Sequence, residues 1–140
     1  MAVRTILAVL VVAVVWGGLD AAIHGFLLAP TYGATASLWR PPGEMKGGLG
    51  LAVTTVAAAC FVLTYALLVR PKSIGMGLAW GALFGVGTGL GMGLGTYCYM
   101  PIPTTLAAAW FGAAVLKALA AGVLAALVVG KPKPAAPAAS

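Results

Sequence analysis

The sequence predicts an all-α membrane protein, a four-helix bundle in which every long helix crosses the bilayer. Hydrophobic residues make up 62% of the chain and charged residues only 7%. A soluble core of ordinary size cannot bury that much apolar surface. The apolar residues also fall into four runs, and a run of about 20 residues is long enough to cross a hydrocarbon core. We therefore expect lipid to be the solvent for most of the chain.

The four predicted spans are separated by short segments that contain prolines. The spans cover residues 5–28, 48–69, 74–96 and 104–129. Connections this short make consecutive helices antiparallel neighbours, which gives an up-down-up-down bundle. Arg4 and the apolar run after it are also typical of a signal peptide. The run continues past Trp16 to Leu28, however, so we expect a retained first helix.

Charged residues predict the orientation. Those on the side of the two termini are Arg4, Arg70, Lys72, Lys131 and Lys133, and those on the other side are Arg40, Glu44 and Lys46. The positive-inside rule places both termini in the cytoplasm (N-in/C-in), and we expect a bacterial inner membrane. An aromatic belt at the opposite interface supports this orientation: Tyr32, Trp39, Tyr97 and Tyr99.

The positions of the basic residues also limit the partners that we expect for the chain. The net charge of +6 would suit nucleic acid, but the basic residues lie between apolar runs, where membrane topology accounts for them. We therefore expect the lipid bilayer, other membrane subunits or further copies of the chain as partners, and no nucleic acid. Residues 131–140 are rich in proline and alanine and predict an extended cytoplasmic tail rather than a second domain.

The third span has a regular glycine pattern. One row repeats every four residues, at Gly77, Gly81, Gly85, Gly89 and Gly93, and a second row contains Gly87, Gly91 and Gly95. Residues four apart share a helix face, so both rows predict grooves where another helix packs closely, inside the monomer or between subunits. The alternative is a pore-lining or hinge-like helix, because many glycines weaken helical rigidity.

Three ionisable residues lie at membrane depth: Asp20, His24 and Lys117. At a rise of about 1.5 Å per residue, Asp20 and Lys117 lie roughly 22 and 18 Å from the cytoplasmic ends of their helices. These depths agree within the reach of a lysine side chain, which leads to the hypothesis of an intramembrane ion pair. His24 follows Asp20 by four residues and shares its face. The cluster is either a structural clamp or a proton- or ion-coupled site.

We predict no cofactor. Haem on His24 would need a second ligand, such as Met92 or a residue of a second subunit, and no zinc or copper spacing is present. Cys60 and Cys98 lie roughly 15 Å apart in depth, which excludes a disulfide in one relaxed monomer. Motifs of soluble enzymes are absent, so we expect no catalytic residues and at most a subunit of an enzyme complex.

Several short motifs give a resemblance. They are His24-Gly25, LWRP at 38–41, AWGALFG at 79–85, YCYMPIP at 97–103 and AWFG at 109–112. In these the chain resembles a loose group of uncharacterised small bacterial membrane proteins with four spans, which implies a fold and no chemistry. The chain is also similar in architecture to small multidrug exporters, which have a carboxylate in the first helix. Here Lys117 would disfavour cationic drugs.

Three function classes follow from these patterns. The first is a non-catalytic accessory or assembly subunit of a larger inner-membrane complex, packing through the glycine-rich third helix. The second is a small homo-oligomeric ion- or proton-coupled transporter or channel that uses Asp20, His24 and Lys117. The third is a redox subunit that binds haem or quinone.

Overall fold

Four long apolar helices form the bundle, which confirms the predicted all-α class. The computed structural model describes residues 2–130, and the predicted tail at 131–140 lies outside the described residues. The candidate spans are Ala2–Leu27, Gly47–Leu68, Ile74–Tyr99 and Thr104–Val129. Each candidate span lies close to a predicted apolar run. Positions that face lipid and positions that pack against another helix are both apolar, so the polar connections mark where each span begins and ends.

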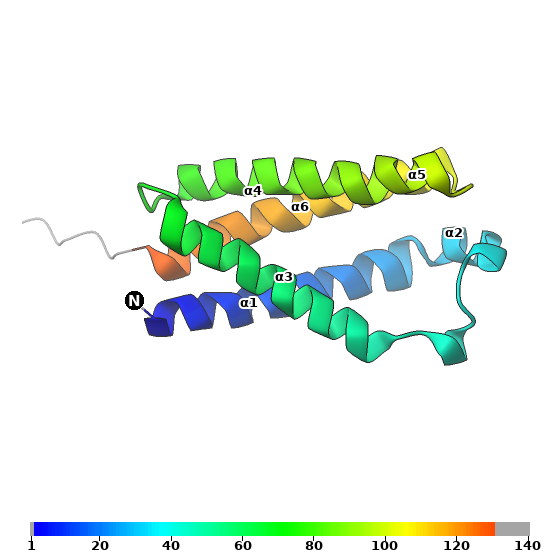
Figure 1. Cartoon of the computed structure of the whole chain (residues 1–140), viewed down its shortest axis with the longest axis horizontal. Helices are drawn as coiled ribbons and strands as arrows, with labels where there is room; N and C mark the ends of the chain where they lie inside the picture. The colour runs from blue at the N-terminus through cyan, green and yellow to red at the C-terminus, as the bar shows by residue number, and fades with distance from the viewer. Residues whose placement is uncertain (1, 131–140) are drawn as a thin grey trace, which may run out of the picture.

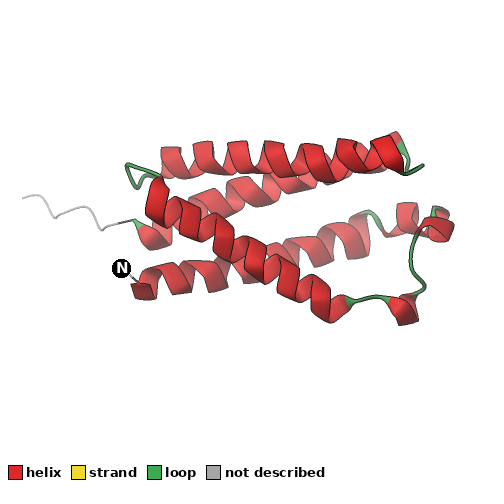
Figure 2. Ribbon diagram, in the orientation of Figure 1, coloured by secondary structure: helices red, strands yellow, loops and turns green. Residues whose placement is uncertain are grey.

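The spans are built from helices of different regularity (Figures 1 and 2). The first is α1 (Ala2–Ala22) continued by the π-helical turn η1 (Ile23–Leu27), and the second is α3 (Gly47–Leu68). The third is α4 (Ile74–Gly89), η4 (Leu90–Gly95) and α5 (Thr96–Tyr99), and the fourth is α6 (Thr104–Val129). The connection between the first two spans contains α2 (Ala29–Ala34) and the short turns η2 (Ala36–Leu38) and η3 (Pro42–Glu44).

The two ends of the bundle differ in charge. We call the end where α1 begins and α6 ends the terminal end, and the opposite end, which carries α2 and η3, the loop end (Figure 1). Arg4 in the first turn of α1 donates to the carbonyl oxygen of Gly130, 2.9 Å away, and so ties the start of α1 to the residue that follows α6. Which end faces the cytoplasm stays a prediction.

The seam between α4 and α6 is formed by the first glycine row. A Cβ atom on Gly81 would meet the carbonyl oxygen of Ala118, and one on Gly93 would meet that of Ala107. The same holds along the whole row, whose members are Gly77, Gly81, Gly85, Gly89 and Gly93. The two backbones are therefore in direct contact, as small residues at a membrane helix interface allow.

The second glycine row has no such neighbour. A Cβ atom on Gly87 or Gly91 would meet nothing within 4 Å, and one on Gly95 would meet only the carbonyl oxygen of Leu90 in its own span, at 3.5 Å. Within one copy of the described chain this row therefore packs against no other helix. Its predicted packing role, between subunits, stays a prediction.

Helices α1 and α3 pack through larger side chains, in the half of the bundle nearer the terminal end. Val12 and Trp16 of α1 and Phe61 and Tyr65 of α3 are buried there, together with alanines of α6. The turn between α3 and α4 is fixed by the Tyr65 hydroxyl, which donates to the carbonyl of Ser73 (3.1 Å). From this turn α3 runs obliquely, and its first turns lie far from α4 at the loop end (Figure 1).

Candidate functional site

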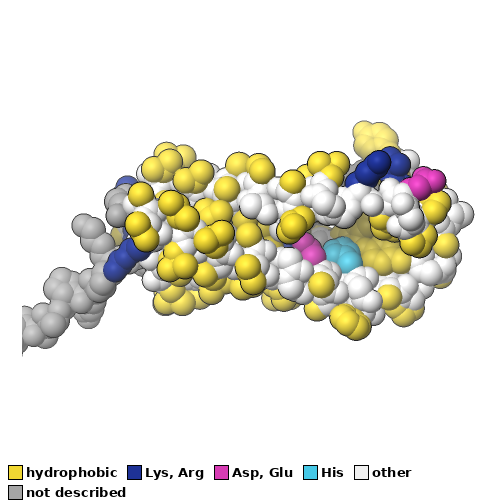
Figure 3. All heavy atoms as spheres, turned by 90° about the horizontal axis from the view of Figure 1, so that it is seen from below, with side chains coloured by type: hydrophobic (Ala, Val, Ile, Leu, Met, Phe, Trp, Pro, Cys, Tyr) yellow, Lys and Arg dark blue, Asp and Glu magenta, His cyan; other side chains and the backbone are white. Residues whose placement is uncertain are grey.

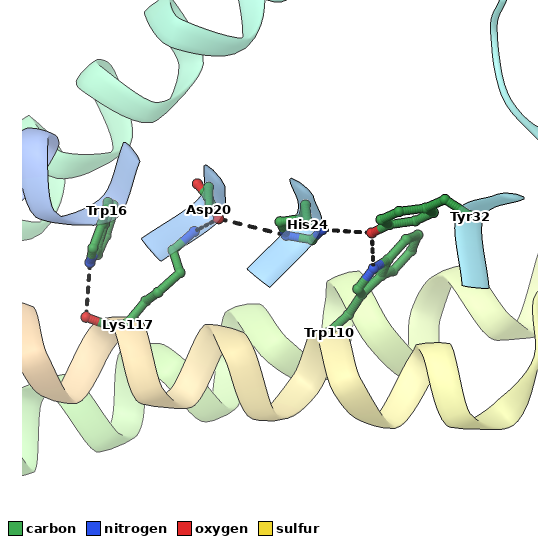
Figure 4. Close-up of polar contacts among 6 residues, drawn as sticks. All are labelled: Trp16, Asp20, His24, Tyr32, Trp110 and Lys117. Atoms are coloured by element: carbon green, nitrogen blue, oxygen red, sulfur yellow. Dashed lines mark hydrogen bonds and ion pairs between the residues drawn. The ribbon is translucent and has the colours of Figure 1, made fainter. Parts of the chain in front are cut away.

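The structure brings the three intramembrane ionisable residues together (Figure 4). Asp20 lies in the last turn of α1, His24 follows in η1, and Lys117 lies near the middle of α6. The Lys117 Nζ atom is 2.5 Å from Asp20 Oδ1, and His24 Nε2 is 3.6 Å from the same oxygen. One carboxylate oxygen of Asp20 therefore faces both basic groups.

A further hydrogen-bonded pair extends this cluster toward the loop end. The Tyr32 hydroxyl of α2 lies 2.6 Å from His24 Nδ1, and the Trp110 Nε1 group of α6 donates to the same hydroxyl oxygen at 2.8 Å. When the tyrosine hydrogen points to Nδ1, the imidazole proton lies on Nε2, facing Asp20. A continuous series of polar groups thus connects Tyr32 through His24 to Asp20.

Tyr32 lies outside the membrane spans, and its ionisation is affected by its surroundings. Burial raises the pKa of the Tyr32 phenol, the hydrogen bond from Trp110 opposes this rise, and the negative charge of Asp20 adds to it. The ring also contacts Trp39 edge-on, with ring centroids 5.5 Å apart. Tyr32 therefore keeps its proton, and remains neutral, at pH values above its ordinary pKa.

Trp16 positions Lys117 from the other side. Its Nε1 group donates to the Lys117 carbonyl oxygen at 2.8 Å. This bond ties α1 to α6 one turn nearer the terminal end than Asp20. The Lys117 ammonium lies 5.6 Å from the centre of the Trp16 ring, within the range of a cation–π interaction. The lysine is thus held by its backbone, by an aromatic face and by the carboxylate.

An aromatic cluster closes the bundle on the terminal side of the ion pair. We call it the aromatic plug, and it contains Trp16, Phe61, Trp80 and Phe84 from α1, α3 and α4. Phe61 is central: its ring lies 5.6 Å from those of Trp16 and Trp80 and 5.0 Å from that of Phe84. Since Phe61 is fully buried, the plug separates the ion pair from the terminal end.

A cavity of about 390 Å³ lies beside the ion pair, lined by all four spans. Its polar wall is formed by Asp20, His24 and Lys117, and the remaining walls include Thr54, Ala57, Thr88 and Met92 with the rings of Trp16, Phe84 and Trp110. The space-filling view shows the surface hollowed beside a histidine and an adjacent acidic side chain, continuing over apolar side chains toward the loop end (Figure 3). The ion pair is therefore accessible from one side.

The loop end of the cavity is covered on the α6 side by a second apolar cluster. Leu28, Ile102, Leu106 and Ala107 are buried there and pack against the rings of Tyr32, Trp39 and Trp110. The first turns of α3, by contrast, are exposed along their length. The cavity therefore lies beside the loop-end half of α3, where α1 and α3 diverge (Figure 1).

Sequence reasoning placed Asp20, His24 and Lys117 in one cluster but missed Tyr32 and Trp110 as members of it. Tyr32 was predicted only as part of the aromatic belt, because a connection of unknown path gives no position for its side chain. The spacing of eight between His24 and Tyr32 gave no signal, because residues eight apart in a straight α-helix lie about 12 Å apart along its axis. The π-helical turn η1 and the bend at Leu28 interrupt the helix between them. Trp110 carried no signal either, because the angle of α6 about its own axis could not be read from the sequence.

The two cysteines lie outside this cluster. Cys60 and Cys98 are free and exposed. Across residues 2–130 no group of three His, Cys, Asp or Glu side chains could hold a metal ion. Met92, considered as a partner of His24 in haem ligation, does line the same cavity as His24.

Comparisons with protein families, curated proteins and solved structures found no match to this chain. Of the resemblance to small bacterial four-span proteins, the structure supports the four-span membrane architecture.

Proposed function

We propose that this protein is a small proton-coupled membrane transporter whose solute site is the cavity beside Asp20. The observation that carries the proposal is the exposure of a charged pair to a cavity at membrane depth. The Asp20 and Lys117 side chains keep 31% and 19% of their accessible surface. A clamp that only fixes helix register would gain from being sealed, because charges inside a membrane are costly and normally face a partner or a water-filled path.

The asymmetry of the bundle also supports transport. The aromatic plug closes the terminal side of the ion pair, while the other side opens beside α3. A transporter needs a site that is closed on one side while it is open on the other. In this proposal the loop-end half of α3 closes over the cavity as the contacts around Phe61 loosen.

The polar series at the loop end supplies the proton route. The Tyr32 hydroxyl, the His24 ring and the Asp20 carboxylate lie in sequence, separated by 2.6 and 3.6 Å. A histidine with a polar neighbour facing each ring nitrogen can accept a proton on one side and release it on the other. Asp20 is the group that binds the proton during transport in this proposal.

The test is proton flux into liposomes that contain the purified protein and a pH-sensitive dye, with candidate solutes added outside. We expect solute-dependent acidification with the wild type and its loss in Asp20→Asn. The matched control is Glu44→Gln, which removes the other acidic residue of the chain, at the loop end outside the spans. Equal flux in Asp20→Asn and the wild type would contradict the proposal.

A second candidate is the accessory-subunit function, and one observation favours it. Gly87 and Gly91 form a face of α4 and η4 that no helix of the described chain covers. Such a face suits a helix of another membrane protein. Purification in a mild detergent followed by mass spectrometry tests this: other subunits at fixed stoichiometry support it, and a pure homo-oligomer supports the transporter.

We further propose that the terminal end faces the cytoplasm of a bacterial inner membrane, because Arg4, Arg70 and Lys72 gather there. Cys98, which is exposed in α5 near the loop end, is a suitable site for chemical labelling in this test. A membrane-impermeant maleimide should label intact cells through Cys98 and fail to label a Cys98→Ser variant. Labelling that requires cell lysis would reverse the orientation.

A further inference from the structure

We propose that the cavity binds an organic monoanion together with one proton. This inference rests on the proposed function, since it names the solute class of the same site. In the bound state Asp20 carries the proton and the Lys117 ammonium pairs with the anion. A neutral weak acid that enters from the membrane and transfers its proton to Asp20 reaches the same state.

The charge balance of the site leads to this state. Without ligand, the negative Asp20 carboxylate and the positive Lys117 ammonium cancel, at a separation of 2.5 Å. An anion that bound alone would compete for Lys117 and leave the carboxylate unpaired, which is costly at low dielectric. When Asp20 takes up a proton, the ammonium is released to the anion and the net charge stays zero. Anion and proton binding therefore favour each other.

Asp20 faces two basic groups in the cavity. From η1 it faces His24 and from α6 Lys117, and Tyr32 of α2 contacts it only through the His24 ring. Helices α3 and α4 contribute only two polar groups to the cavity wall, the hydroxyls of Thr54 and Thr88. Among the described residues that line the cavity, Lys117 is the one permanent cation, so one negative charge on the ligand is balanced and two are not.

The walls determine the rest of the ligand. Aromatic rings of Trp16, Phe84 and Trp110 and the side chain of Met92 line the cavity. Such walls stabilise an apolar body and offer few groups to replace the hydration shell of an inorganic ion. A volume of about 390 Å³ is in the range of small-molecule sites. The geometry therefore favours a small carboxylic acid with an apolar or aromatic body.

The experiment is calorimetry on the full-length protein in nanodiscs, with benzoate and benzylamine as probes. The two probes share a ring and differ in the sign of their charge. We expect benzoate to bind, with an affinity that rises up to about tenfold for each unit of pH decrease while Asp20 is ionised in the free protein. Titrations in two buffers of different ionisation enthalpy should give uptake of one proton for each benzoate. Tighter binding of benzylamine, or benzoate binding without proton uptake, would overturn the inference.

Variants assign the two roles. Asp20→Asn should bind benzoate without proton uptake and with an affinity that no longer depends on pH, because Lys117 is already released. The neutral double variant Asp20→Asn/Lys117→Met should remain folded, since both charges leave together, and should lose benzoate binding. Lys46→Met, which removes a lysine outside the spans, is the matched control and should bind as the wild type does. Undiminished binding by the double variant would overturn the inference.

The outcome separates this inference from the proposed function. Proton-linked benzoate binding in nanodiscs without flux in liposomes would support the ligand class and contradict transport. Flux of another solute through Asp20, with no benzoate binding, would support transport and overturn the ligand class.

Discussion

The two helix pairs of this bundle are packed in opposite ways. Helix α6 contacts α4 and its continuation η4 along the full glycine row from Gly77 to Gly93, with backbone against backbone. Helices α1 and α3 contact each other through large side chains such as Trp16 and Phe61, and they diverge toward the loop end (Figure 1). The cavity and the ion pair lie in the part of the bundle where α1 and α3 separate while α4 and α6 stay in contact.

The difference teaches how a small membrane protein combines rigidity with a binding site. In lipid, helices associate through close packing rather than through hydrophobic burial, so small residues hold two helices together. Large rings hold helices further apart and leave space where they end. One seam therefore serves as the fixed frame, and the other pair forms the part that can open.

The largest effect is expected from Phe61→Ala, which removes the centre of the aromatic plug. Truncation of a buried phenylalanine costs about 4 kcal/mol of the free energy of unfolding. Because Phe61 contacts rings of α1 and α4, the variant should also connect the cavity to the terminal end. Denaturation in detergent measures the stability, and dye leakage from liposomes measures the opening. Unchanged leakage would show that the plug does not separate the two sides.

Next in size is Lys117→Met, which leaves Asp20 without its ion pair. A charge left without its partner at membrane depth is expected to cost about 3 kcal/mol. The double variant Asp20→Asn/Lys117→Met should recover most of that loss, because no uncompensated charge remains. The free energies of unfolding of both variants measure the difference. A double variant less stable than the single one would show that the side chains matter for packing and not for charge.

Gly81→Ala and Gly87→Ala compare the two faces of α4 directly. At Gly81 the added methyl group meets the α6 backbone, and overpacking of this kind costs about 2 kcal/mol. At Gly87 it meets nothing within 4 Å, so the higher helix propensity of alanine should stabilise by about 0.8 kcal/mol. Thermal unfolding in detergent measures both. A destabilising Gly87→Ala would instead reveal a partner on the second glycine row.

The smallest effect concerns Tyr32 at high pH. Since its pKa is raised in the folded state, the proton stabilises the fold, fully below the ordinary tyrosine pKa of about 10 and less as the pH rises through the folded value. The stability difference between the wild type and Tyr32→Phe should thus be constant up to about pH 9 and shrink above pH 10. Unfolding in detergent across this range measures it. A difference that grows with pH would contradict the burial of the phenol.

Positions along the bundle axis could be predicted from the sequence, because depth depends only on helical rise and on where the apolar runs end. The four spans, the charge difference between the two ends and the similar depths of Asp20 and Lys117 all follow from that rule. The spacing of four between Asp20 and His24 likewise fixed their common face.

Positions around the helix axes were decided only by the tertiary structure. Each span is apolar on all sides, because lipid and neighbouring helices are equally apolar surroundings, so no polar face marks the interior. The sequence therefore gave no reason for α6 to choose the row of Gly81 over that of Gly87, or for Trp110 to meet Tyr32 and His24. Close packing of backbones at one seam fixed these rotations, and with them the cavity beside Asp20.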